Sequence, residues 1–386
     1  MRILRTYIRL ETGLLYVARC VTWGILRGTK MVLYTLELKR FCRNMPERII
    51  YHNPDHTEHK GWTDAEGKSW DVPERLFPVL DTLLSDDTLR TEWLIVPEFH
   101  QETLDIIAKS HSVEMIEAIA KASSEATNDN PIKTQFDKGA ETDASAIYPG
   151  TFNQALMSAE CAVSAADALV SDQAALTITV SRPPGHHAGR NFYHGFCYFN
   201  LAAIATEVLK ESGKKVAIID FDVHHGDGTQ DIFYDDPDVF YTSLHADPAL
   251  VMPGTGYIDE TGVNNNIANF PLPIGVDNVA YMQALNEACR RIKNFNPDYL
   301  VIEAGFDGHK DEFPDLPPIT QLGDEQYHEI GKIIGAMQIP SLVIFGGGYN
   351  QDVTSDAFLR YIQGMEVGRG VRSEIDLYTS HDILPH

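Results

Sequence analysis

Residues 216–228 read VAIIDFDVHHGDG, an apolar run that leads directly into a cluster of carboxylates and imidazoles. Residues 216–219 predict a buried strand. Side chains two apart on a strand share a face, so Asp220, Asp222 and His224 should converge at its carboxyl end, where open α/β sheets bind ligands. Two oxygens and a nitrogen there indicate part of a metal site. The alternative is a helix N-cap flanked by solvated acids.

A second strand is predicted for residues 174–180, and it ends in a proton-carrying pair. Residues 183–185 (PPG) form a stiff turn that can continue neither strand nor helix. His186 and His187 follow, and imidazoles exchange protons near neutral pH. An isolated histidine pair is commonly a surface feature, but its position at a strand end favours a functional role.

Two further predicted strands, 299–304 and 341–345, also end in reactive residues. The first leads to Asp307, a third carboxylate. The second leads to the triple glycine 346–348, which lets the backbone bend sharply, and then to Tyr349. Each could be an ordinary turn or flexible loop, but four such strand ends together favour one active site.

Five motifs together resemble the zinc-dependent histone deacetylase family, including its bacterial acetylpolyamine amidohydrolases. They are RPPGHH (182–187), GFCYFN (195–200), DFDVHHGDG (220–228), GFD (305–307) and GGGY (346–349). The resemblance covers residues from about 49 to 366. It implies one α/β domain of the arginase/deacetylase fold, with a mostly parallel eight-stranded sheet between helical layers.

The resemblance implies a role for each matched residue. Asp222, His224 and Asp307 would hold zinc, leaving a position open for water. His187 would take the water proton and return it to the leaving amine, with His186 as its electrostatic partner.

Three more residues complete the implied catalytic set. Asp227 and Asp220 would orient His187 and His186, respectively, as carboxylates that fix a tautomer. Tyr349 would donate a hydrogen bond to the tetrahedral oxyanion.

The family also carries a structural potassium ion behind the zinc. The matching positions are Asp220, Asp222, His224, Ser243 and Leu244.

The substrate tunnel departs from the family pattern in one place. The family has two facing phenylalanines; Phe196, after Gly195, matches one, but Met252 replaces the other. Methionine is more adaptable, so the acyl group accepted stays open. Asp143, in a polar stretch, is a candidate for binding substrate at the rim.

Charge is distributed unevenly along the chain. Residues 1–48 carry ten Lys/Arg against three Asp/Glu, and the rest of the chain 21 against 52. We therefore expect a basic N-terminal extension over 1–45 and a catalytic domain over 46–386. The extension could be a presequence, a membrane-surface helix or the result of a misplaced start codon, with Met31 or Met45 as the true start.

The acidic body argues against direct nucleic-acid binding and favours cationic substrates such as polyamines, although acidity can serve solubility alone. No apolar run reaches the ~20 residues of a membrane span. The five cysteines, at 20, 42, 161, 197 and 289, form no Cys-x-x-Cys pair. This favours reduced thiols and a cytoplasmic location.

The leading hypothesis is hydrolysis of an acylated primary amine, either acetyl-lysine or acetylpolyamine, with zinc as cofactor and potassium as a second candidate ion. Alternatives are a binuclear arginase-like ureohydrolase, an amide hydrolase for another small molecule and a non-catalytic acyl-lysine-binding module. A homo-oligomer and iron as the native metal are also left open.

Overall fold

The computed structural model describes residues 4–9, 15–20, 48–54, 59–60, 70–85, 94–139, 145–211, 213–371 and 373. The chain divides into two compact units, Met1–Pro46 and Glu47–His386. In the first, β1 (Leu4–Arg9) and β2 (Leu15–Cys20) pair antiparallel. No helix among the described residues is long and apolar enough to cross a membrane.

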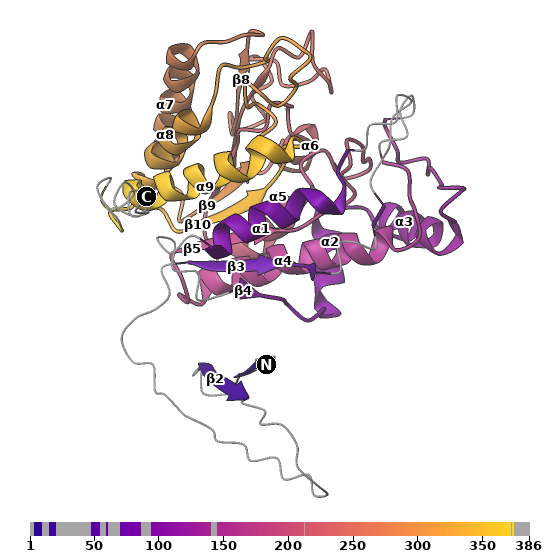
Figure 1. Ribbon diagram of the computed structural model, residues 1–386. Coiled ribbons are helices and arrows are strands. Elements are labelled where there is room, and N and C mark those ends of the chain that lie inside the picture. The colour runs from indigo at the N-terminus through magenta and orange to yellow at the C-terminus, as the bar shows by residue number, and fades with distance from the viewer. Residues whose placement is uncertain are drawn as a thin grey trace, which may run out of the picture. The chain divides into compact units, whose positions relative to one another are not determined.

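The second unit is built on an eight-stranded sheet in the order β4-β3-β5-β10-β9-β6-β7-β8 (Figure 1). Every neighbouring pair is parallel. The strands are β3 (Ile49–His52), β4 (Leu94–Ile95), β5 (Leu176–Val180), β6 (Val216–Asp220), β7 (Val239–Ala246), β8 (Ile267–Leu272), β9 (Tyr299–Ala304) and β10 (Ser341–Phe345). The expected eight-stranded α/β fold is confirmed, and the sheet is parallel throughout.

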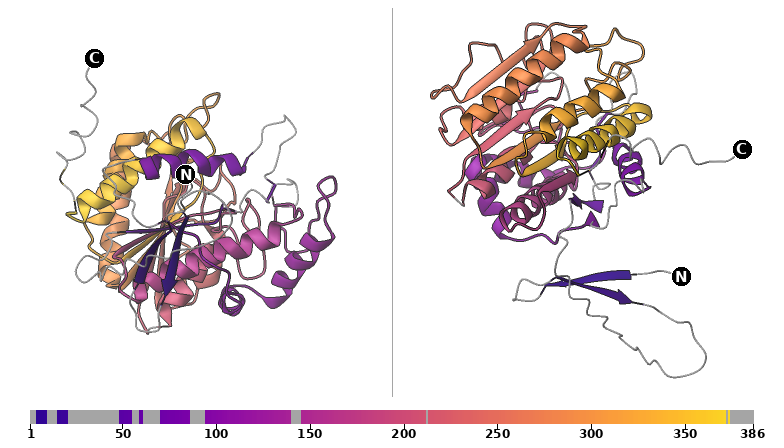
Figure 2. Two further views of the ribbon diagram at one scale, coloured as in Figure 1. Left: turned by 60° about the horizontal axis from the view of Figure 1, so that its bottom comes forward. Right: turned by 90° about the vertical axis from the view of Figure 1, so that its left-hand side faces the viewer.

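Helices cover both faces of this sheet (Figure 2). One core lies against α2 (Glu102–Ser110), α3 (Val113–Glu125), α4 (Thr151–Val170), α5 (Leu201–Lys210) and α6 (Asp227–Phe233). The other lies against α1 (Leu76–Ser85), α7 (Asn278–Phe295), α8 (Asp324–Gly335) and α9 (Gln351–Gly368). Burial on both faces explains why the inner strands read as continuous apolar runs.

Strand order brings the sequence motifs together. β5, β10, β9 and β6 are consecutive neighbours, so the segments after their carboxyl ends lie along one edge of the sheet. These segments carry the two histidines, Tyr349, Asp307 and the 220–228 motif. The fold therefore assembles one site from segments more than 160 residues apart.

Candidate active site

Asp222, His224 and Asp307 form a compact cluster at the ends of β6 and β9. His224 Nδ1 lies 3.1 Å from Asp222 Oδ1 and 2.9 Å from Asp307 Oδ2. The ligand atoms of the three side chains all lie within 4.8 Å of one another. Both carboxylates are buried, whereas the His224 side chain is 23% exposed. The cluster thus has one side open toward solvent.

The charges of this cluster call for a cation. Burial alone lowers the pKa of His224, but hydrogen bonds with Asp222 and Asp307 raise it to about 10. Burial and then the charge of Asp222 raise the pKa of Asp307 to about 6. Ligands bound tetrahedrally at zinc distances lie about 3.3 Å apart, close to the separations seen here. The two carboxylates and the imidazole therefore fit a divalent metal.

Two glycines permit this close approach. A Cβ at Gly347 would lie 2.4 Å from Asp222 Oδ2, and one at Gly305 would lie 2.4 Å from Asp222 Cα. Without side chains, the β10 loop comes near enough for Gly347 N to donate to Asp222 Oδ2 at 3.0 Å. Any larger residue at either position would push the loops apart.

The two adjacent histidines each have a carboxylate partner. His186 Nδ1 is 3.1 Å from Asp220 Oδ2, and His187 Nδ1 is 2.9 Å from Asp227 Oδ1. The ring centroids are 4.0 Å apart. The family resemblance implied these two pairings.

The surroundings of the two rings nevertheless shift their pKa values in opposite directions. Burial lowers the pKa of His186, but the carboxylates of Asp222 and Asp220 outweigh burial and raise it to about 10. Burial and the positive charge of His186 hold the pKa of His187 well below its usual value. These surroundings therefore favour the neutral form of His187 and the protonated form of His186.

Tyr349 lies in an aromatic setting. Its ring centroid is 5.5 Å from that of Phe196 and 5.7 Å from that of Trp70. The Arg75 guanidinium lies 4.5 Å from the ring centroid. Burial raises the pKa of Tyr349 well above its usual value, so the phenol keeps the proton that it can donate.

The loop that carries Tyr349 is fixed by two residues that sequence reasoning missed. Arg75 donates to the carbonyl oxygens of Gly346 and Gly348, each at 2.7 Å. The buried Glu312 accepts from the backbone N–H of Tyr349 at 2.6 Å and of Asn350 at 3.2 Å. No motif marks either residue, since both act on backbone groups far away in the chain.

A cavity of about 820 Å³ joins these groups. Its lining residues are Trp70, Lys138, Gly139, Pro184, His186, His187, His194, Gly195, Phe196, Asp222, His224, Asp227, Met252, Pro253, Phe313, Gly347 and Tyr349. Predicted substrate residues Gly195, Phe196 and Met252 are among them, and Met252 is 45% exposed. Asp143 lies outside the described residues. Sequence reasoning missed Trp70, Lys138, Phe313 and His194.

The residues matched to a potassium site lie behind the cluster. Ser243 on β7 is in register with Asp220 on β6, and both are fully buried. Ser243 Oγ is 2.8 Å from His245 Nδ1, and Asp220 Oδ1 accepts from Asp222 N at 3.1 Å. Leu244 follows on the same strand. Of the matched residues, Asp220 thus lies on β6, with Ser243 and Leu244 on the neighbouring strand β7.

Comparisons with known proteins agree with this geometry. A family model described as the histone deacetylase domain matches residues 70–365. Acetylpolyamine amidohydrolase of Mycoplana ramosa is 40% identical over 211 residues, which span 53% of this chain and 60% of that protein. A probable deacetylase of Archaeoglobus fulgidus is 34% identical over 280 residues, or 71% of each chain.

A solved structure is also similar. The crystal structure of acetylpolyamine aminohydrolase from Burkholderia pseudomallei superposes with a TM-score of 0.72 at 27% identity, covering 83% of this chain and 99% of that one. The family match covers well over half of the sequence and includes every motif named above. The chain belongs to the histone deacetylase domain family.

Proposed function

We propose that the chain is a zinc-dependent deacetylase that hydrolyses an acylated primary amine to the free amine and a carboxylate. One observation carries this proposal: Asp222 and His224 of the metal-binding cluster line the same cavity as an imidazole and a phenol. The names of the relatives, acetylpolyamine amidohydrolase and probable deacetylase, support the same chemistry.

Asp222, His224 and Asp307 would hold the zinc ion. When bound, zinc polarises the amide carbonyl and acidifies water. Asp227 accepts the Nδ1 proton of His187, which leaves Nε2 with its lone pair. His187 then takes a proton from the attacking water at Nε2 and delivers it to the departing nitrogen.

Tyr349 and His186 would stabilise charge during this reaction. The phenol donates to the carbonyl oxygen as negative charge grows on it. Protonated His186, held by Asp220, adds a fixed positive charge and keeps His187 neutral. Behind them, Asp220, Ser243 and Leu244, with Asp222 and His224, would hold potassium.

The alternatives have weaker support. An arginase-like ureohydrolase would need two metals and would not need a phenol at position 349. A non-catalytic binding module would have lost a ligand, the base or the phenol, whereas the sequence retains the residues assigned to all of these roles. The three described cysteines are free and buried, which favours a cytoplasmic location.

An acetylated polyamine is the substrate we favour. The relatives' names support it, and so does the acidic body, which carries 21 Lys/Arg against 52 Asp/Glu beyond residue 48. Such charge steers cations toward the protein, and salt screens the effect.

The test is amine release from a panel of acetylated polyamines, acyl-lysine peptides and neutral acetyl amides of matched length. For the polyamine, kcat/KM should fall as ionic strength rises from about 0.01 M to 0.15 M, whereas the neutral amide should change little. If the polyamine and the neutral amide respond equally to salt, the acidic charge no longer supports a polyamine substrate. If no compound of the panel is turned over, the deacetylase proposal is rejected.

A further inference from the structure

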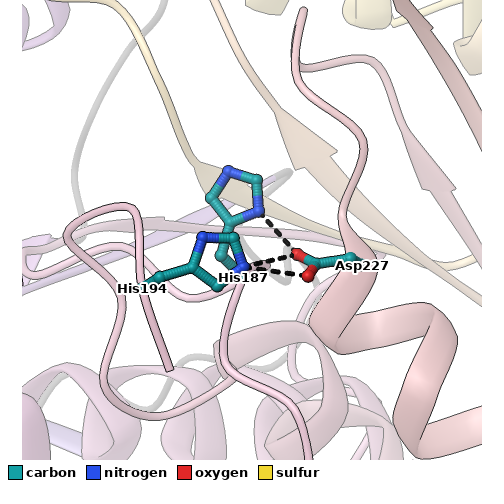
Figure 3. Close-up of side chains that lie close together, drawn as sticks. All are labelled: His187, His194 and Asp227. Atoms are coloured by element: carbon teal, nitrogen blue, oxygen red, sulfur yellow. Dashed lines mark hydrogen bonds and ion pairs between the residues drawn. The ribbon is translucent and has the colours of Figure 1, made fainter. Parts of the chain in front are cut away.

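A second three-residue cluster lies beside the metal-binding set and shares no residue with it. It consists of His187, His194 and Asp227, all buried. Figure 3 shows the two imidazoles, from the segment after β5, approaching the carboxylate at the start of α6. The hydrogen bond of His187 with Asp227 has a role in the proposed reaction, but that reaction does not use His194.

The ligand atoms of this cluster all lie within 4.8 Å of one another, close enough to hold one metal ion. Asp227 Oδ1 lies 2.9 Å from His187 Nδ1, and Asp227 Oδ2 lies 2.9 Å from His194 Nε2. Tetrahedral zinc would need about 3.3 Å between ligand atoms, a change of a few tenths of an ångström. All three residues line the 820 Å³ cavity, so an ion from solvent can reach them.

We propose that His187, His194 and Asp227 form a second, inhibitory site for Zn²⁺ or a similar borderline divalent cation. The inhibitory part rests on the proposed function, because it requires His187 to be the base. Two imidazole nitrogens and one carboxylate form a donor set that suits zinc. The ion displaces two hydrogen bonds and leaves the first metal in place.

Inhibition follows from the proton balance of one ring. A neutral imidazole has one protonated nitrogen and one lone pair. In the metal-free cluster, His187 donates from Nδ1 and keeps its lone pair on Nε2. An ion bound at His187 Nδ1 and His194 Nε2 takes a lone pair from each nitrogen. The single ring proton of His187 therefore moves to Nε2, and that of His194 moves to Nδ1. His187 can then no longer accept a proton from water.

Lys138 sets the affinity of this site. Its Nζ lies 3.8 Å from Asp227 Oδ2 and 3.7 Å from the centroid of the Phe192 ring. The ammonium repels a cation at Asp227, but the side chain is 54% exposed and can move into solvent. The second site should therefore fill only at zinc concentrations above those that fill the first.

The experiment uses the full chain carrying one zinc ion. Added Zn²⁺ is followed by equilibrium dialysis with metal analysis and, in parallel, by amine release. The wild type should bind a second equivalent and lose activity as it does. The variant His194→Asn keeps a donor for Asp227 but lacks the imidazole. Residues that only hydrogen-bond to a metal ligand already contribute about 10- to 100-fold in metal affinity. Loss of His194 should therefore shift both the zinc-binding curve and the inhibition curve to at least about tenfold higher zinc.

Two control variants sharpen the test. Lys138→Met removes the repelling ammonium, so binding of the second zinc ion and the loss of activity should both occur at lower zinc concentrations. His100 is an exposed histidine 3.1 Å from the carboxylate of Glu160, so His100→Asn tests for adventitious binding and should change neither curve.

The possible outcomes separate the two proposals. The second site is rejected if the wild type binds only one zinc ion, or if His194→Asn binds the second ion with unchanged affinity. Binding of the second ion without loss of activity overturns the inhibitory role. If no acylated amine is turned over, the proposed function fails, but the dialysis still decides whether the second site exists.

Discussion

The two histidine–carboxylate pairs of the active site are nearly identical in composition and differ in charge. Both rings present Nδ1 to an aspartate, at 3.1 Å in the His186–Asp220 pair and 2.9 Å in the His187–Asp227 pair. Yet the pKa of His186 is raised to about 10, while that of His187 lies well below its usual value.

The difference comes from the third group that each ring meets. His186 Nε2 lies 3.9 Å from Asp222 Oδ1, so a second carboxylate favours its protonated form. His187 instead lies between His186 and His194, with ring centroids at 4.0 and 4.7 Å. The hydrogen-bonded partner therefore orients a histidine, while the wider surroundings set its charge.

The two pairs should differ most in how much kcat falls when each imidazole is removed. His187→Ala removes the proposed base and acid, so kcat should fall by roughly 10²–10⁴ with metal content unchanged. His186→Ala removes only an electrostatic partner and should cost less. Single-turnover and steady-state assays of both variants check this order, and an equal or larger loss in His186→Ala would reverse the assignment of the base.

The phenol should act independently of both pairs. Tyr349→Phe removes one hydrogen bond to the developing oxyanion, so kcat should fall on the order of 10²–10³ while zinc stays bound. Because neither histidine changes, the remaining activity should keep the wild-type pH profile. A kcat near normal would remove Tyr349 from the mechanism.

The acid limb of the pH profile tests the charge difference itself. His187 works as a base only when neutral, and its pKa is lowered, so kcat/KM should persist to below pH 6.5. It should then fall about tenfold per pH unit as His187 is protonated. His186→Gln removes the neighbouring positive charge and should move this limb to higher pH. An unmoved limb would show that His186 does not set the pKa of His187.

The sequence predicted the strand ends well because each apolar run ends directly in a reactive residue. β3 and β8 were among the strands that the sequence did not predict, for physical reasons. β3 has only four residues, and β8 contains Pro271, which an edge strand tolerates but which weakens the strand pattern.

Contacts between residues far apart in the chain were the other feature that the sequence could not predict. The hydrogen bond from Tyr349 N to Glu312 joins residues 37 apart in the sequence, and the one from Arg75 to the Gly346 carbonyl joins residues 271 apart. The resemblance supplied the pairing of His187 with Asp227. It did not supply His194, which lies just before the GFCYFN motif, or the opposite pKa shifts of His186 and His187, which depend on spatial neighbours.

The smallest expected effect concerns the N-terminal unit. We propose that residues 1–44 are dispensable for catalysis, since they precede every motif and differ in charge from the rest of the chain. A protein that starts at Met45 should keep kcat and the pH profile of both histidine pairs. Insolubility or lost turnover would show that the segment contributes to the catalytic domain.

Metal content measured together with turnover tests the central claim most directly. After dialysis against metal-free buffer, active wild-type protein should hold one zinc per chain. Asp307→Ala should hold none and release no amine, while its circular dichroism spectrum stays that of the wild type. Two tightly held ions in the active wild type, or normal turnover in zinc-free Asp307→Ala, would contradict a single metal at Asp222, His224 and Asp307.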